Sequence, residues 1–362
     1  MPENKRNPIV DIAKGVGIVL VVLGHNGVVE TEAKEMTRII FSFHMPLFIL
    51  ISGVYLKTTY SFREILTIKT VSLLKPYSSM MLFAGMLLVL QGMVDGTRYA
   101  WGMLYATGES IGGGAHSTLI PLWFLPSLYL GLLFSWAILR LVARSRYREL
   151  LTLATALLSL LIGVGYLEAF WHLEIPAPLY GVIVPYGVWQ LPGLPFGADL
   201  VPIFCAFILL GYLLREKIKI MTFNGLIFFS SLTVFTMLHC LFDYSIDLNR
   251  RYFDNFLVSI IQIACGIYIA FALSAIFSSV RYVGSALQYI GSASLIILIF
   301  HQPLQYWVLT LFSDNHEPLI YLSGTMAFLI GLGIPMVIFE LMKRYSLLAA
   351  PFLPLGAIGN RT

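Results

Sequence analysis

Long apolar runs recur along almost the whole of this 362-residue chain, and they restrict its fold more than any other feature. A run of roughly 20 apolar residues is long enough for a helix to cross the hydrocarbon core of a bilayer. Such segments can be read at residues 13–29, 39–57, 73–94, 121–142, 149–170, 197–214, 222–241, 256–279, 285–311 and 318–342. The sequence therefore predicts an all-α fold, a polytopic membrane helical bundle of about ten transmembrane helices.

The composition agrees with this prediction and excludes a soluble domain. Hydrophobic residues make up 58% of the chain and charged residues only 12%, against about 25% charged in soluble domains. We expect one transmembrane domain over residues 1–345 and a short cytoplasmic tail over residues 346–362. The stretch at 173–197 is apolar but rich in Pro and Gly, which is compatible with a re-entrant loop.

Basic residues set the expected orientation, because cytoplasmic loops of membrane proteins carry an excess of Lys and Arg. With the N-terminus inside, only Lys34, Arg38, Arg98, Arg250 and Arg251 remain outside. The other 18 of the 23 basic residues are then cytoplasmic. Both termini are therefore predicted to be cytoplasmic. The net charge of +4 follows from this topology and gives no reason to expect a nucleic-acid partner.

The first apolar segment contains two ionisable residues, Lys14 and His25, which are eleven positions apart. On a helix, eleven steps return to within about 20° of the same face and rise about 16 Å. Ionisable groups in a membrane cost about 2.5 to 3.5 kcal/mol each on insertion scales, so they usually have a function. We expect Lys14 near the inner face and His25 near the outer face, although Lys14 alone could extend to the interface.

Two further histidines are predicted to reach the depth of His25 from other helices. His44 lies just below the outer end of the second segment, and His301 lies in the outer half of the ninth. Pro46 cannot donate to the carbonyl of Ser42, so we expect the second segment to break beside His44. Other polar or aromatic residues expected on the outer side are Arg38, Trp123, Asp199, Arg250, Arg251, Asp254 and Asn255. Trp123 could also belong to an interfacial aromatic belt.

The inner side has its own charged residues. Asp11 and Lys14 are three positions apart, so they can pair on one helical face. Between the second and third segments, Lys57, Arg63, Lys69 and Lys75 alternate with apolar residues. Such an amphipathic basic segment is suited to anionic phospholipid or to a phosphorylated ligand, or it could only hold the loop inside.

These residues form a pattern that resembles the acyltransferase 3 family of integral membrane O-acyltransferases. The pattern starts with the lysine, ten intervening residues and histidine of the first segment, followed by FSFHMPLFILISGVYLK. It continues through REILTIKTVSLLKPY, PLWFLPSLYLGLLF, LPFGADLVPIFCAFILLGYLLREK, DLNRRYFDN and LQYIGSASLIILIFHQP. The resemblance covers nearly the whole chain and is closest to the branch similar to fucose 4-O-acetylase.

The resemblance implies transfer of an acetyl group from cytoplasmic acetyl-CoA to a hydroxyl of a cell-surface or lipid-linked glycan, in the bacterial inner membrane. It places His25 at the family's essential histidine and Lys14 at its basic partner. Arg63 and Lys69 fall in the segment that the family places near the donor. Acetyl-CoA would be a co-substrate, with no bound cofactor, and the other expected partners are the glycan acceptor and membrane lipid.

An imidazole can act as a general base or as a transient acyl acceptor near neutral pH, and we expect His25 to do one of these. His44 is then a candidate to orient His25 or to stabilise the oxyanion. The acceptor-side candidates are Arg38, Trp123, Asp199, Asn255 and His301.

An alternative function is a secondary transporter that uses an intramembrane His and Lys proton relay. Transporters tend to contain internal repeats, and the sequence has no second copy of the Lys14 and His25 pattern or of FHMPLF.

A metal site is not expected, because the histidines have no close-spaced partner. All three cysteines lie in apolar segments, where they are expected to pack as small hydrophobic residues.

Overall fold

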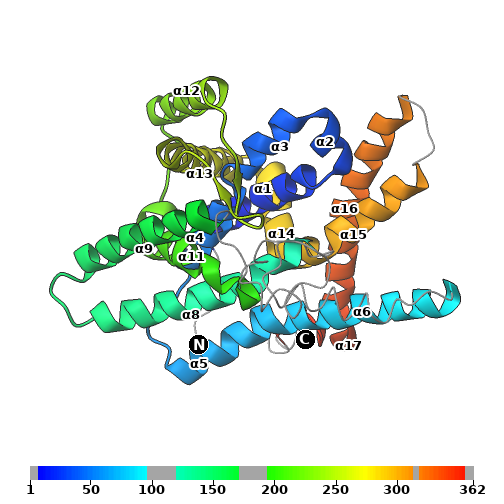
Figure 1. The fold of residues 1–362 in the computed structure, drawn as a ribbon, viewed down its shortest axis with the longest axis horizontal. Helices are drawn as coiled ribbons and strands as arrows, with labels where there is room; N and C mark the ends of the chain where they lie inside the picture. The colour runs from blue at the N-terminus through cyan, green and yellow to red at the C-terminus, as the bar shows by residue number, and fades with distance from the viewer. Residues whose placement is uncertain (1–6, 96–119, 171–193, 313–317, 355–362) are drawn as a thin grey trace. The chain divides into compact units, whose positions relative to one another are not determined.

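The computed structural model describes residues 7–95, 120–170, 194–312 and 318–354, which are almost entirely helical (Figure 1). The helices of the first half are α1 (Pro8–Gly24), α2 (Gly27–Glu32), α3 (Lys34–Phe41), α4 (His44–Val54), α5 (Phe62–Lys69), η1 (Thr70–Leu74), α6 (Lys75–Asp95), η2 (Ile120–Trp123), α8 (Phe124–Val142) and α9 (Arg148–Phe170). Those of the second half are η3 (Pro195–Leu200), α11 (Val201–Lys219), α12 (Gly225–Leu241), α13 (Phe256–Ser279), α14 (Arg281–Ser292), α15 (Ser294–Leu311), α16 (Pro318–Arg344) and α17 (Ser346–Ala349). Two short strands, β1 (Ile246–Asp247) and β2 (Tyr252–Phe253), pair in the loop before α13. The prediction of an all-α fold is confirmed.

Seven helical segments in the described part of the chain are long and apolar enough to cross a membrane. They are Lys34–Val54, Pro121–Val142, Arg148–Ala169, Pro195–Lys219, Phe256–Ser279, Ser294–Leu311 and Leu319–Arg344. The chain is therefore a multi-pass membrane protein. The total of ten helices and the cytoplasmic termini remain predictions, and most of the expected re-entrant loop lies outside the described residues.

The chain divides into two compact units. The first contains residues 1–57, 207–246 and 255–362, and the second contains residues 58–206 and 247–254. The helix α11 passes from the second unit into the first after Ala206. The expected boundary between a domain at 1–345 and a tail at 346–362 stays a prediction.

Helix α1 starts and ends at residues suited to those positions. The side chain of Asn7 accepts a hydrogen bond from the backbone of Val10, and Pro8 occupies the first helical position, where its missing N–H costs nothing. We expected a helix over 13–29, but α1 ends at Gly24 and α2 begins at Gly27. This prediction was wrong because the side chain of Asn26 caps a new helix by accepting from the backbone of Val28, and hydropathy alone does not detect caps.

The second apolar segment contains the expected break. Helix α3 ends at Phe41 and α4 begins at His44, with Phe43 in a non-helical conformation between them. Pro46 lies in the first turn of α4, where its missing N–H does not interrupt helical bonds. The chain therefore turns directly beside His44.

The ninth apolar segment is not one helix, as we expected for residues 285–311. Helix α14 ends at Ser292 and α15 begins at Ser294, separated by Ala293. The residues at this junction are Gly291, Ser292, Ala293 and Ser294. Gly and Ser are weaker helix formers than Ala, so the helix can break here. The continuous apolar run therefore contains two helices.

Helices α1 and α14 approach each other closely through two glycines. A side chain at Gly15 would clash with the backbone carbonyl of Leu287, and a side chain at Gly291 would clash with that of Asp11. Small residues permit such close approach of helices in membranes. The reciprocal contacts hold α1, which carries Lys14 and leads into His25, against α14.

Candidate active site

His25 lies directly after α1, at the turn into α2, and its side chain is mostly buried, with 14% exposed. Its ring centroid is 5.3 Å from that of Phe41 and 5.7 Å from that of His301. These residues come from three separate helices or helix ends of the first unit. The fold thus gathers imidazoles from distant parts of the sequence.

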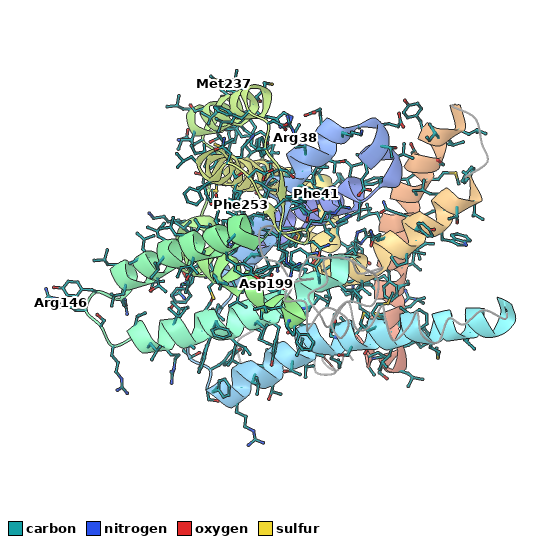
Figure 2. All side chains as sticks on the ribbon, in the orientation of Figure 1. Arg38, Phe41, Arg146, Asp199, Met237 and Phe253 are labelled. Atoms are coloured by element: carbon teal, nitrogen blue, oxygen red, sulfur yellow. The ribbon has the colours of Figure 1, made fainter. Side chains whose placement is uncertain are left out.

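His44 is the first residue of α4 and is buried. Its ring centroid is 5.0 Å from that of Phe41, so the Phe41 ring contacts both His25 and His44 (Phe41 is labelled in Figure 2). The Nδ1 atom of His44 is 2.9 Å from the carbonyl oxygen of Ile40. The break between α3 and α4 therefore places a fixed imidazole beside a shared aromatic ring.

His301 lies within α15 and is fully buried. Its Nδ1 atom is 2.9 Å from the carbonyl oxygen of Ile297 and 3.0 Å from that of Leu298. Its Nε2 atom is also buried and makes no hydrogen bond to any described residue. One turn later, the side chain of Gln305 donates to the carbonyl of Val22 at 2.8 Å, which joins α15 to α1.

These contacts determine which nitrogen carries the proton in His44 and His301. A carbonyl oxygen can only accept, so the Nδ1 atom of each ring must be the donor. In the neutral ring, Nε2 is then an acceptor with an available lone pair. The same tautomer serves general bases that take a proton from a hydroxyl group, and its Nδ1 is likewise held by an acceptor.

Lys14 lies on α1 and pairs with Asp11 at 3.5 Å, so the predicted pairing of these two residues is confirmed. The Nζ atom of Lys14 also lies 4.8 Å from the centre of the Tyr55 ring. The ammonium is therefore held by a carboxylate and an aromatic face, with 27% of the side chain exposed.

Arg63 and Lys69 lie on α5, in the second unit. Helix α5 begins at Ser61, whose backbone N–H and hydroxyl both donate to Oε2 of Glu64, at 2.7 and 2.8 Å. These hydrogen bonds lower the pKa of Glu64. Arg63 is exposed and Lys69 half-buried, so the capped helix presents the guanidinium of Arg63 on its surface.

Trp123 and Asp199 also belong to the second unit. Trp123 is buried and makes edge contacts with Phe124 and Phe204. Asp199 (labelled in Figure 2) accepts from Nε and Nη2 of Arg251, at 2.9 and 3.1 Å. Both side chains of this ion pair are fully buried.

Arg38 lies on α3 within a charged cluster of the first unit. It pairs with Glu35 at 2.9 Å and with Asp243 at 3.2 Å. His239 contacts Glu35 through Nε2 at 2.9 Å and the hydroxyl of Tyr244 through Nδ1 at 3.2 Å. Burial raises the pKa of Tyr244, so its hydroxyl keeps its proton and can donate to the ring.

Asn255 precedes α13 and adopts a left-handed backbone conformation with φ of 45°. Its side chain is exposed and makes no capping bond to α13.

The expected site residues fall into two groups. His25, His44, His301, Lys14, Arg38 and Asn255 lie in the first unit, and Arg63, Lys69, Trp123 and Asp199 lie in the second.

No three His, Cys, Asp or Glu side chains gather closely enough to hold a metal ion in the described ranges. The expectation that the protein needs no metal remains a prediction. The polar cluster built by the histidines is thus best considered for its acid and base chemistry.

A comparison with known protein families matches residues 7–340 to the family described as an acyltransferase domain, acyltransferase 3. The chain belongs to the acyltransferase 3 family. It is therefore an acyltransferase, and the enzyme class expected from the sequence is confirmed. Neither the curated proteins nor the solved structures contain a significant match to the chain. The particular branch of the acyltransferase 3 family remains a prediction.

Sequence reasoning did not identify three residues that the acyltransferase places at its histidine cluster. Phe41 lies three positions before His44, a helical spacing that could have indicated a shared face. Gln305 lies four positions after His301 in an apolar helix, where a polar side chain is itself a signal. Glu30 lies in the first turn of α2, and its Oε1 atom is 3.8 Å from Nδ1 of His25.

Proposed function

We propose that this acyltransferase is an O-acetyltransferase that moves an acetyl group from cytoplasmic acetyl-CoA to a hydroxyl of a cell-surface or lipid-linked glycan, in the bacterial inner membrane. The observation that carries the proposal is a cluster of three histidines. The ring of Phe41 contacts His25 and His44, and the ring of His25 contacts His301. Acyl transfer to a hydroxyl needs a group that removes the hydroxyl proton or holds the acyl group between substrates. An imidazole can do either.

His25 is the proposed reacting group, because its ring contacts both Phe41 and His301 and is still partly exposed. As a base, it would take the hydroxyl proton while the hydroxyl oxygen bonds to the acetyl carbon and the bond from carbon to sulfur breaks. As a nucleophile, it would first accept the acetyl group and then pass it to the hydroxyl. In both routes the leaving CoA thiolate takes up one proton.

His44 and His301 are proposed to orient the acceptor. Each presents Nδ1–H to a backbone carbonyl, which leaves Nε2 as an acceptor for a hydroxyl. This arrangement favours binding of a hydroxyl over stabilisation of an oxyanion, which requires a donor. Arg38 and Asn255, which lie in the same unit as the histidines, remain candidates for further acceptor contacts.

The donor is proposed to enter at the opposite end of α1. Lys14 is eleven residues before His25, and an α-helix rises about 16 Å over that length. The phosphates of CoA would interact with Lys14, because phosphate groups favour cationic partners. Arg63 and Lys69 belong to the second unit and remain separate candidates for donor binding. The flexible arm that joins the phosphates to the thioester would then extend along α1 towards His25.

The test uses purified protein in lipid nanodiscs, acetyl-CoA carrying a labelled acetyl group, and lipid-linked glycans extracted from bacterial membranes. The wild type is expected to release free CoA thiol and to transfer label to the glycan fraction. His25→Ala should lower this rate by about 100-fold or more, within the 10²–10⁴ range of general acid and base catalysis.

Thr325→Ala is the control, because the exposed hydroxyl of Thr325 on α16 donates to the carbonyl of Tyr321 on its own helix. It should change the rate by less than about threefold. A folded His25→Ala variant that transfers label at the wild-type rate would exclude the role given to His25. Failure of the wild type to use acetyl-CoA would exclude the proposed donor.

A further inference from the structure

Glu30 is the carboxylate that lies next to the proposed reacting histidine. Its Oε1 atom is 3.8 Å from Nδ1 of His25. The Glu30 side chain is 47% exposed, whereas that of His25 is 14% exposed. The carboxylate therefore keeps contact with solvent while it faces a mostly buried imidazole.

The turn between α1 and α2 holds Glu30 in this place. Asn26 is buried and accepts from the backbone of Val28 through Oδ1, at 3.1 Å. Its Nδ2 atom donates to the carbonyl of Gly324 in α16, at 2.7 Å. The backbone N–H of Glu30 then bonds to the carbonyl of Asn26 at 2.9 Å, so Glu30 is one helical turn from an anchored residue.

Helix α2 also packs closely on its neighbours. A side chain at Gly324 would contact Val28 at 2.9 Å, and one at Gly27 would contact Leu309 at 3.0 Å. These contacts leave little room for α2 to move relative to α15 and α16. The backbone that carries Glu30 is therefore held next to His25 by buried contacts elsewhere in α2.

The three histidines of the cluster differ in what faces their Nδ1 atoms. Nδ1 of His44 lies against the neutral carbonyl of Ile40 on the preceding helix α3, and Nδ1 of His301 lies against neutral carbonyls of its own helix α15. Nδ1 of His25 faces a carboxylate. A carboxylate favours the doubly protonated ring that exists after proton transfer, while a neutral carbonyl does so less strongly.

We propose that Glu30 is a positioning residue. Its carboxylate lies 3.8 Å from Nδ1 of His25, beyond hydrogen-bond distance in this structure, and its charge attracts Nδ1–H and leaves the Nε2 lone pair directed to the acceptor hydroxyl. This inference rests on the proposed function. The hydroxyl proton moves to Nε2, the hydroxyl oxygen bonds to the acyl carbon, the thioester bond breaks, and the CoA thiolate then takes the proton. Glu30 stays ionised throughout and touches no reacting atom.

The decisive variant is Glu30→Gln, with Glu32→Gln as its matched control. Glu32 lies on the same short helix and is exposed, so both variants remove one negative charge from α2. A glutamine amide at position 30 can present an N–H to Nδ1, which favours the wrong tautomer, as for an aspartate to asparagine change in a catalytic triad. Glu30→Gln should lower kcat for acetyl transfer by about 10- to 100-fold, with KM for acetyl-CoA changed less than twofold.

A second measurement does not depend on activity. Proteins with ¹⁵N-labelled histidine rings in nanodiscs report the tautomer of His25 through the chemical shifts of its two nitrogens, assigned with His25→Ala. The wild type and Glu32→Gln should show protonated Nδ1, and Glu30→Gln should show protonated Nε2. An unchanged tautomer in Glu30→Gln would overturn the proposal, even if acetyl-CoA proves to be the wrong donor.

The kinetic outcomes are equally decisive when the wild type is active with acetyl-CoA. An unchanged kcat in Glu30→Gln excludes a positioning role. A raised KM with unchanged kcat would assign Glu30 to substrate binding and also overturn the proposal. An equal loss in Glu32→Gln would attribute the effect to the charge of α2 as a whole.

Discussion

The histidine cluster of the first unit and the ion pair of the second unit are both made of polar groups buried in an apolar chain, but they differ in how completely those groups are bonded. Asp199 receives two hydrogen bonds from Arg251 and one from the backbone of Leu194. Arg251 also donates to the carbonyl of Asn249 at 2.6 Å. In the cluster, by contrast, Nε2 of His301 is buried without a partner in the described part of the chain.

The buried ion pair has a structural role, whereas the histidine cluster is suited to a chemical one. A buried charge is costly unless it is paired and hydrogen-bonded, and the second unit meets that requirement with its own residues. A buried ring nitrogen with an unused lone pair has a cost that the fold does not offset. We therefore expect substitutions at the ion pair to act on stability and substitutions in the cluster to act on catalysis.

The largest effect is expected from Asp199→Leu, which removes the carboxylate that pairs with the buried guanidinium of Arg251. Breaking a buried ion pair costs about 3 to 5 kcal/mol, so the thermal unfolding midpoint should fall strongly. The double variant Asp199→Leu with Arg251→Met should recover much of this loss.

Asp247→Asn is the control for that experiment, because the partner of Asp247, Arg250, is 67% exposed. It should change the midpoint little, as exposed pairs contribute little. If Asp199→Leu keeps its stability and loses transfer activity, the pair belongs to the reaction and the contrast between the two regions fails.

The second prediction concerns His301→Leu, which removes the unpartnered Nε2 and fills a similar volume. We expect turnover to fall by roughly 10- to 100-fold. Thermal stability should be unchanged or higher, because an unsatisfied polar atom leaves the interior. Turnover and the thermal unfolding midpoint should be measured on one preparation, because turnover is expected to fall while the midpoint stays the same or rises. A strong loss of stability would show that His301 is mainly structural.

The third prediction tests whether the contact between α1 and α14 is as tight as the two glycines indicate. Gly291→Ala should lower the unfolding free energy by about 1 to 3 kcal/mol, because the new methyl group meets the carbonyl of Asp11. Gly333→Ala, on α16, has no atom within 4 Å of the added methyl group and should be neutral or slightly stabilising. Equal effects of the two changes on the thermal midpoint would contradict the packing argument.

The smallest effect is expected from Lys14→Gln, which removes one cation from the proposed donor end. KM for acetyl-CoA should rise about two- to fivefold with little change in kcat, because a partly exposed charge contributes modestly. Lys34→Gln, at the start of α3, is the matched control and should leave KM unchanged. An unchanged KM in Lys14→Gln would mean that Lys14 only extends to the membrane interface.

Hydropathy predicted the fold class well, because the length of an apolar run is nearly sufficient to identify a membrane helix. It failed where the chain breaks inside an apolar run, after Gly24 and again at Ala293. These breaks depend on capping and on small residues, which change the backbone without changing hydropathy. Asn26, which follows Gly24 by two residues and directly precedes Gly27, was the signal that could have located the first break.

The candidate site was predictable in part, because topology converts sequence positions into depths. The predicted topology puts His25 and His301 at one depth, and their ring centroids are 5.7 Å apart. It could not find the partner of Asp199 or the carboxylate beside His25, because depth does not determine which side chains face each other. Those contacts depend on rotation about each helix and on turns of two or three residues.

The glycine contacts between α1 and α14 also limit how far these two helices can move relative to each other. Gly15 and Gly291 interlock the two helices through their backbones, so α1 cannot slide or rotate on α14 without separating from it. A carrier that works by alternating access needs elements that rock past one another. Here the segment that bears Lys14 and leads to His25 is held against α14, so under the proposed function the acyl group and its carrier would move while this helix stays in place.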